Sequence, residues 1–75
     1  MNKRSIEDAL DRSRHPSARE RRSALLELCP CEVRANVPAV WDRLVEMQND
    51  PDVRLRRRAR RRMAEYRRTG RINQE

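Results

Sequence analysis

Residues 37–69 read VPAVWDRLVEMQNDPDVRLRRRARRRMAEYRRT, and this stretch decides the fold. Its first half places apolar residues three and four positions apart, which is the spacing of one helix face. The members of that face are Val37, Val40, Trp41, Leu44 and Val45, with Gln48 completing the series. Asp50-Pro51-Asp52 then ends this helix and starts another, with Asp50 as the cap and Pro51 in the first turn. The stretch therefore predicts two helices joined by a tight turn.

The second of these helices, expected from about Pro51 to Thr69, consists largely of arginine. Nine of the fifteen residues from Arg54 to Arg68 are Arg. On a helical wheel its apolar residues form a stripe only about 80° wide, which is narrower than the face of an ordinary core helix. They are Leu55, Ala59, Met63 and Tyr66. Gly70 is expected to cap the C-terminus, and residues 70–75 to form a polar tail.

Two further helices are expected before residue 30. A capping-box pattern at Ser5 predicts a short helix that ends near Arg14. His15-Pro16-Ser17 breaks it, and a second capping box at Ser17 starts another helix, which Pro30 stops. The apolar side of that helix comprises Ala18, Leu25, Leu26, Leu28 and Cys29, and Asn36 is placed to cap the next helix. The expected core consists of Ile6, Leu10, Leu25, Leu28, Val37, Val40, Trp41, Leu44, Leu55, Ala59 and Met63.

These patterns predict an all-α fold in a single small domain of 75 residues. Four helices are expected, as two antiparallel helix-turn-helix pairs. The chain also repeats itself at an interval of 35 residues, because residues 15–19 (HPSAR) align with residues 50–54 (DPDVR) and Ala24 aligns with Ala59. A period in this range is typical of solenoid proteins.

The unit from Val37 to Arg54, with its Asp-Pro-Asp turn followed by Val-Arg, resembles a HEAT repeat. The stretch from Leu28-Cys29-Pro30-Cys31 to Leu44 is similar to small bacterial HEAT-repeat proteins. The resemblance implies a fragment of an α-solenoid that binds partners and carries no chemistry of its own. Residues 1–29 would form a degenerate first repeat, and residues 36–69 a second repeat that ends in the arginine-rich helix.

This last helix departs from the family pattern, which has small or apolar residues where this chain has Arg57, Arg60 and Arg61. The first repeat keeps Leu25 and Leu26 at the matching positions. Either the helix is rotated onto its own apolar stripe, or it gives up core contact. Both alternatives expose extra guanidinium groups. Two repeats are also fewer than the roughly three that usually stand alone, so the open ends favour docking on another protein or a homo-oligomer.

The whole net charge of +7 lies in the last third of the chain. Residues 1–50 hold nine Lys or Arg and nine Asp or Glu, whereas residues 51–75 hold ten Arg against three acids. A polyanionic partner relieves the repulsion within such a cluster. The candidate binding residues are therefore Arg54, Arg56, Arg57, Arg58, Arg60, Arg61, Arg62, Arg67, Arg68 and Arg71.

Two kinds of partner fit these arginines. The favoured hypothesis is a non-enzymatic accessory protein that docks its arginine-rich helix on nucleic acid or a ribonucleoprotein, with RNA or a ribosome-like assembly preferred. The alternative is a HEAT-like adaptor subunit that binds an acidic protein surface without touching nucleic acid. A solvated helix face with no partner is the third interpretation. The excess of 18 Arg over a single Lys suits bidentate phosphate binding, but it also fits a general codon bias.

Cys29-Pro30-Cys31 is the one place where the sequence suggests chemistry. Zinc would need about two more ligands and a wider cysteine spacing, so a metal site or a redox disulfide is a minor hypothesis beside simple packing of both cysteines. No catalytic set, phosphate loop or cofactor motif is evident, and no small-molecule substrate is expected. No apolar run reaches the ~18 residues that cross a bilayer, and the first residues do not resemble a signal peptide. A cytoplasmic protein without membrane contact is expected.

Overall fold

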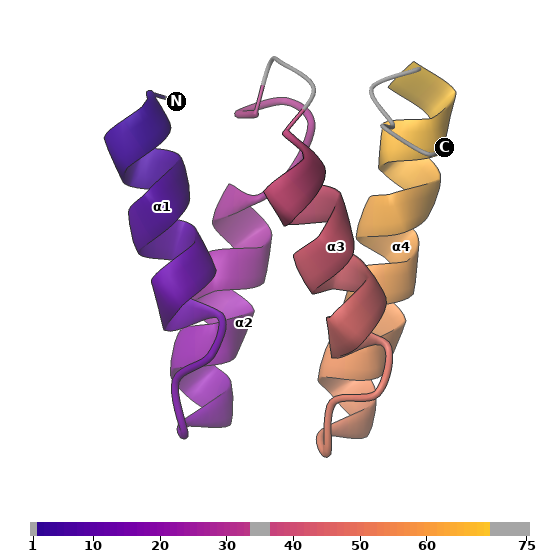
Figure 1. Ribbon diagram of the computed structural model, residues 1–75. Coiled ribbons are helices and arrows are strands. Elements are labelled where there is room, and N and C mark those ends of the chain that lie inside the picture. Colours follow the sequence, from indigo (N-terminus) through magenta and orange to yellow (C-terminus); the bar gives the residue numbers. More distant parts are fainter. Residues whose placement is uncertain (1, 34–36, 70–75) are drawn as a thin grey trace.

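A computed structural model gives the structure of this chain and describes residues 2–33 and 37–69. The described residues form four α-helices and no strand. They are α1 (Lys3–Arg12), α2 (Ala18–Glu27), α3 (Pro38–Met47) and α4 (Val53–Thr69). Figure 1 shows α1 antiparallel to α2 and α3 antiparallel to α4, as two hairpins side by side, and α2 also packs against α4. The predicted all-α fold with two antiparallel pairs is confirmed.

The helices begin at slightly different caps from those expected. α1 begins at Lys3, before the predicted Ser5, because the Asn2 Oδ1 accepts a hydrogen bond of 2.8 Å from the Ser5 N–H. α4 begins at Val53, and its cap is Asp52, whose Oδ1 accepts from the Arg54 N–H at 2.8 Å. The prediction that Asp50 caps this helix and that Pro51 lies in its first turn was wrong, because the helix begins two residues later than expected, at Val53.

The remaining predicted boundaries have mixed outcomes. Pro38 lies in the first turn of α3, as predicted. Ser17 precedes α2 but makes no side-chain cap; its N–H donates to His15 Nδ1 at 2.9 Å. α1 ends at Arg12, two residues before the predicted Arg14. The predicted caps Asn36 and Gly70 and the polar tail lie outside the described residues.

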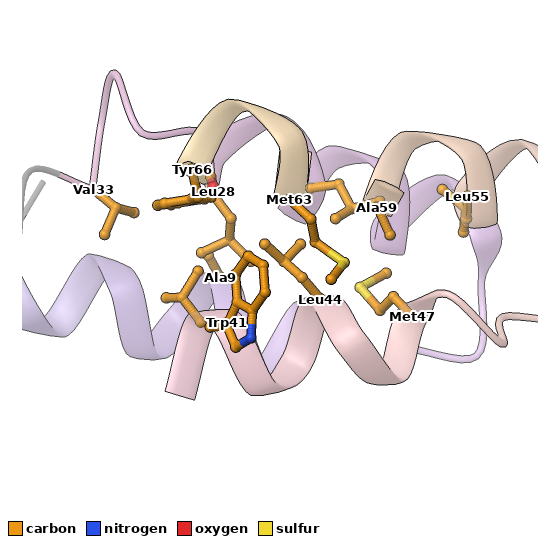
Figure 2. Close-up of a cluster of buried hydrophobic side chains, with 12 residues drawn as sticks. Ala9, Leu28, Val33, Trp41, Leu44, Met47, Leu55, Ala59, Met63 and Tyr66 are labelled. Atoms are coloured by element: carbon orange, nitrogen blue, oxygen red, sulfur yellow. Dashed lines mark hydrogen bonds between the residues drawn. The ribbon is translucent and has the colours of Figure 1, made fainter. Parts of the chain in front are cut away.

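The core lies within and between the two hairpins and draws on all four helices. Figure 2 shows Trp41 and Leu44 of α3 facing Met63 and Ala59 of α4, with Leu28 nearby. The predicted α4 stripe is buried, and Trp41 is only 8% exposed, as expected of a core anchor. The other predicted core residues are buried or packed against this cluster, which Ala9, Val33 and Met47 complete. None of the described helices combines the length and apolar composition of a membrane-spanning segment.

Two residues assigned to apolar faces are instead exposed. Leu26 and Val45 have 47% and 40% of their surface accessible, because the contact face of each helix is narrower than the periodicity indicated. Arg60, which aligns with the buried Leu25, is also exposed, whereas Leu55 is buried. α4 is therefore rotated onto its own stripe, the first of the two alternatives raised by its sequence.

A buried ion pair joins the two hairpins. Arg21 of α2 holds the Asp50 carboxylate with both prongs of its guanidinium, Nε to Oδ2 at 2.9 Å and Nη2 to Oδ1 at 3.0 Å. The two side chains are 13% and 4% exposed. Burial by itself raises the pKa of Asp50, but the hydrogen bonds from Arg21 and the Asp52 N–H, with the charges of Arg21 and Arg43, outweigh it and lower that pKa. The pair therefore stays charged in the folded protein.

Arginines also join the helices at two other points. Arg43 of α3 donates to the Oγ and the carbonyl oxygen of the buried Ser13, at 2.9 and 2.7 Å. Arg12 of α1 bonds Glu27 of α2 at 2.6 Å and Asp8 at 2.9 Å, and these bonds raise the pKa of Arg12. Three of the eight arginines in the first 50 residues therefore join elements of the fold to one another.

Candidate functional site

The arginines of α4 fall into two groups, and the first group is used within the protein. Arg56 donates from Nη1 to the Asp50 carbonyl at 2.7 Å. Arg62 donates from Nε to the Leu25 carbonyl at 3.0 Å and pairs with Glu65 at 2.7 Å. Arg67 lies over the Trp41 ring, 5.3 Å from its centroid. These three members of the predicted binding set therefore have structural contacts.

The second group has no such contacts. Within residues 2–33 and 37–69, six arginine side chains of α4 make no hydrogen bond, ion pair or ring contact. They are Arg54, Arg57, Arg58, Arg60, Arg61 and Arg68, and all except the half-buried Arg58 are exposed. The tenth predicted residue, Arg71, lies outside the described residues. The unpartnered guanidinium groups are the ones available to an external anion.

α2 adds two cations to this surface, which the sequence analysis did not include. The exposed Arg19 and Arg22 of α2 face α4 across a hollow of about 390 Å³, whose lining also includes Arg54 and Arg58. A second hollow of about 180 Å³ shares two of these residues and is lined by Arg54, Arg57, Arg58 and Arg61. We call this surface the arginine groove: Arg19, Arg22, Arg54, Arg57, Arg58 and Arg61.

The groove is basic along its length and contains little that would neutralise it. Ala18 and Leu55 lie between the arginines in the larger hollow, and Asp52 is the acid in its lining. The Asp52 carboxylate already accepts the Arg54 N–H, as the cap of α4. Guanidinium groups from two helices thus line two adjoining hollows. Such an arrangement suits an extended anion with repeated negative charges.

Neither Trp41 nor Tyr66 is available for stacking on bases. They are the only Trp, Tyr or Phe residues of the chain, and they are 8% and 3% exposed. Tyr66 also donates its hydroxyl to the Leu28 carbonyl at 2.7 Å. The protein therefore lacks the aromatic platforms that single-strand binders use, and phosphate contacts would have to dominate.

The arrangement of the two cysteines differs from the simple packing that the sequence favoured. Cys29 and Cys31 form a disulfide, with their Cα atoms 5.3 Å apart. Cys29 is buried at the end of α2, as expected, but Cys31 is exposed on the connector. Among the described residues, no group of three or more His, Cys, Asp or Glu residues is placed to hold a metal ion. The disulfide lies at a different hollow, beside Arg62 and Arg68.

Comparison with protein-family models, with curated proteins and with solved structures finds no match to this chain. The HEAT-repeat resemblance consequently remains a prediction from the sequence. The functional argument depends on the geometry of the arginine groove.

Proposed function

We propose that this protein is a non-enzymatic accessory protein of the cytoplasm that binds the phosphate backbone of nucleic acid through the arginine groove. The observation that carries the proposal is the set of α4 arginines that have no partner within residues 2–33 and 37–69, joined by Arg19 and Arg22 across the groove. Like charges crowded on one surface repel one another, so they do not stabilise the fold of this small domain. Their repulsion is relieved by a polyanion.

RNA, alone or within a ribonucleoprotein, is the favoured form of nucleic acid. The guanidinium plane stacks on unpaired bases as well as bonding phosphates, which compensates for the absence of an exposed aromatic ring. Base identity would contribute little, because arginine is the one hydrogen-bond donor side chain among the residues that line the two hollows. The proposed role is therefore attachment to a structured or extended RNA without strict sequence preference.

The salt dependence of binding tests the proposal. Six groove arginines on six phosphates of a duplex give a slope of log K against log salt of about −5, and about −4 on a single strand. Fluorescence anisotropy with a labelled RNA strand, the same RNA as a duplex and a DNA duplex measures this slope. Binding that is weak and insensitive to salt for all three probes would refute the proposal.

Matched charge-reversal variants locate the site. Arg58→Glu with Arg61→Glu removes two phosphate contacts, which lowers the association constant about 60-fold at ~0.1 M salt. Lys3→Glu with Arg4→Glu changes the net charge equally but lies on the exposed surface of α1. We expect that control to bind within about threefold of the wild type, because exposed charges are screened beyond ~10 Å. Equal losses in both variants would mean that only net charge matters and that the groove is not the site.

A further inference from the structure

The two hairpins each hold an arginine in the same place. Arg21 and Arg56 are 35 residues apart, and each folds back on the turn before its own helix. The Nη1 of Arg21 donates to the carbonyls of His15 and Pro16 at 2.9 and 2.8 Å. The Nη1 of Arg56 donates to the carbonyls of Asp50 and Pro51 at 2.7 and 3.5 Å. The second hairpin therefore repeats the contacts of the first.

The two arginines differ in what they bind on their other side. Arg21 uses Nε and Nη2 to hold the carboxylate of Asp50, which belongs to the next hairpin. Nε and Nη2 of Arg56 have no partner within the described residues. The backbone carbonyls thus fix Arg56 in position, and its free prongs match the pair that binds a carboxylate at Arg21. Nε and Nη2 form the edge of a guanidinium that can pair with a carboxylate through two parallel hydrogen bonds.

The equivalent apolar residues of the two hairpins also differ in how far they are buried. Leu10 and Ala18 of the first hairpin pack against the core. Their counterparts 35 residues later are Val45 and Val53, which are 40% and 47% exposed. The second hairpin therefore shows to solvent the kind of surface that the first hairpin buries. We call this surface the open face: Val45, Val53, Arg56 and Arg60.

We propose that the open face docks a turn between two helices of a different, acidic protein, whose Asp or Glu occupies the free prongs of Arg56. The charge favours this occupant, because the exposed Arg60 beside Arg56 also has no partner within the described residues. The open face shares no residue with the arginine groove. The inference therefore does not depend on nucleic-acid binding.

A second copy of this chain does not fit the open face. Head-to-tail stacking would bring the His15 turn to Arg56, and His15 stands where the second hairpin has the carboxylate of Asp50. Face-to-face pairing would place Arg56 and Arg60 of one copy against the same residues of the other, which is repulsive. The partner must supply the carboxylate from its own sequence.

A peptide with the sequence of residues 45–53 (VEMQNDPDV) is the probe for this site, because it carries the turn that Arg21 binds in the intact protein. It is titrated into the ¹⁵N-labelled full chain while the Arg56 Nε–Hε signal is followed by NMR. We expect a saturable shift of that signal, and about fivefold weaker binding by a control peptide with Asp50→Asn. No shift, or equal binding of both peptides, would overturn the proposal.

Two variants of the full chain separate the open face from general attraction to arginine. Val45→Glu keeps Arg56 and places a negative charge on the open face, so we expect it to abolish the shift without altering the helical content. Arg19→Gln removes a cation from the arginine groove and should leave peptide binding unchanged. Loss of binding in Arg19→Gln, or its persistence in Val45→Glu, would place the peptide elsewhere. Sedimentation equilibrium should show a monomer; a dimer that Val45→Glu dissociates would overturn the assignment to a different protein.

Discussion

The ion pair between Arg21 and Asp50 offers a test of how the two hairpins stay together. We consider Asp50→Asn, which keeps the shape of the side chain and its ability to accept the Asp52 N–H but removes the charge. Breaking one partner of a buried pair costs about 3–5 kcal/mol. Arg21 retains its bonds to two backbone carbonyls, so the lower end of that range, about 3 kcal/mol, is expected.

A loss of this size is a large part of the total stability. A chain of this length is stabilised by about 4–11 kcal/mol, and each kcal/mol lowers the Tm of such a domain by about 4–8 °C. Asp50→Asn should therefore lower the Tm by about 12–24 °C. Urea and thermal unfolding followed by far-UV circular dichroism measure the change. Asp42→Asn is the control, because Asp42 is an exposed acid on α3, and it should change stability by less than about 0.5 kcal/mol.

The same pair makes a prediction about pH. The pKa of Asp50 is lower in the folded protein than its ordinary value of 3.8. Its charge therefore adds stability above the unfolded-state pKa, and this contribution is lost as the pH falls through the lower folded-state pKa. The stability gap between wild type and Asp50→Asn should be full at neutral pH and close in strong acid. A gap below about 0.5 kcal/mol at neutral pH, or one that does not change with pH, would refute this account of the pair.

Two further changes probe the packing of α2 against α4. Tyr66→Phe removes the hydroxyl that bonds the Leu28 carbonyl, and we expect urea unfolding to show a loss of about 1–2 kcal/mol; an unchanged midpoint would mean that water replaces the bond without cost. Leu28→Ala should cost about 2–5 kcal/mol because Leu28 is completely buried. Leu26→Ala, at a half-exposed position within α2, should cost less than about 0.5 kcal/mol, and similar losses in the two leucine variants would contradict the orientation of α2.

The sequence predicted the number and type of helices because their apolar residues follow the helical period. It also predicted the buried stripe of α4, since Leu55, Met63 and Tyr66 are its only large apolar residues apart from Val53. It failed at Leu26 and Val45, where periodicity alone does not reveal how wide the contact face is. Such faces are set by the neighbouring helix, which the local pattern does not contain.

The candidate site combines a helix that the sequence indicated with two residues that it did not. Arginine content located α4, but it could not separate Arg56, Arg62 and Arg67, which bond the protein itself, from the arginines that remain available. Arg19 and Arg22 were missed because they belong to the electrically neutral part of the chain and reach the groove only through the packing of α2 on α4. The Asp50 pair was missed for a similar reason: Asp-Pro-Asp signals a helix start, and its partner lies 29 residues away.

The disulfide of this protein has a consequence for the environments in which it can exist. It joins two residues of one connector and ties no helix to another, so it closes a very small ring and restricts the unfolded chain little. The connector is held independently by the Glu32 and Val33 N–H groups, which donate to the Cys29 carbonyl. Reduced and oxidised forms should therefore share the same four helices, and a cell that keeps its thiols reduced would contain the same folded molecule as an oxidising test tube.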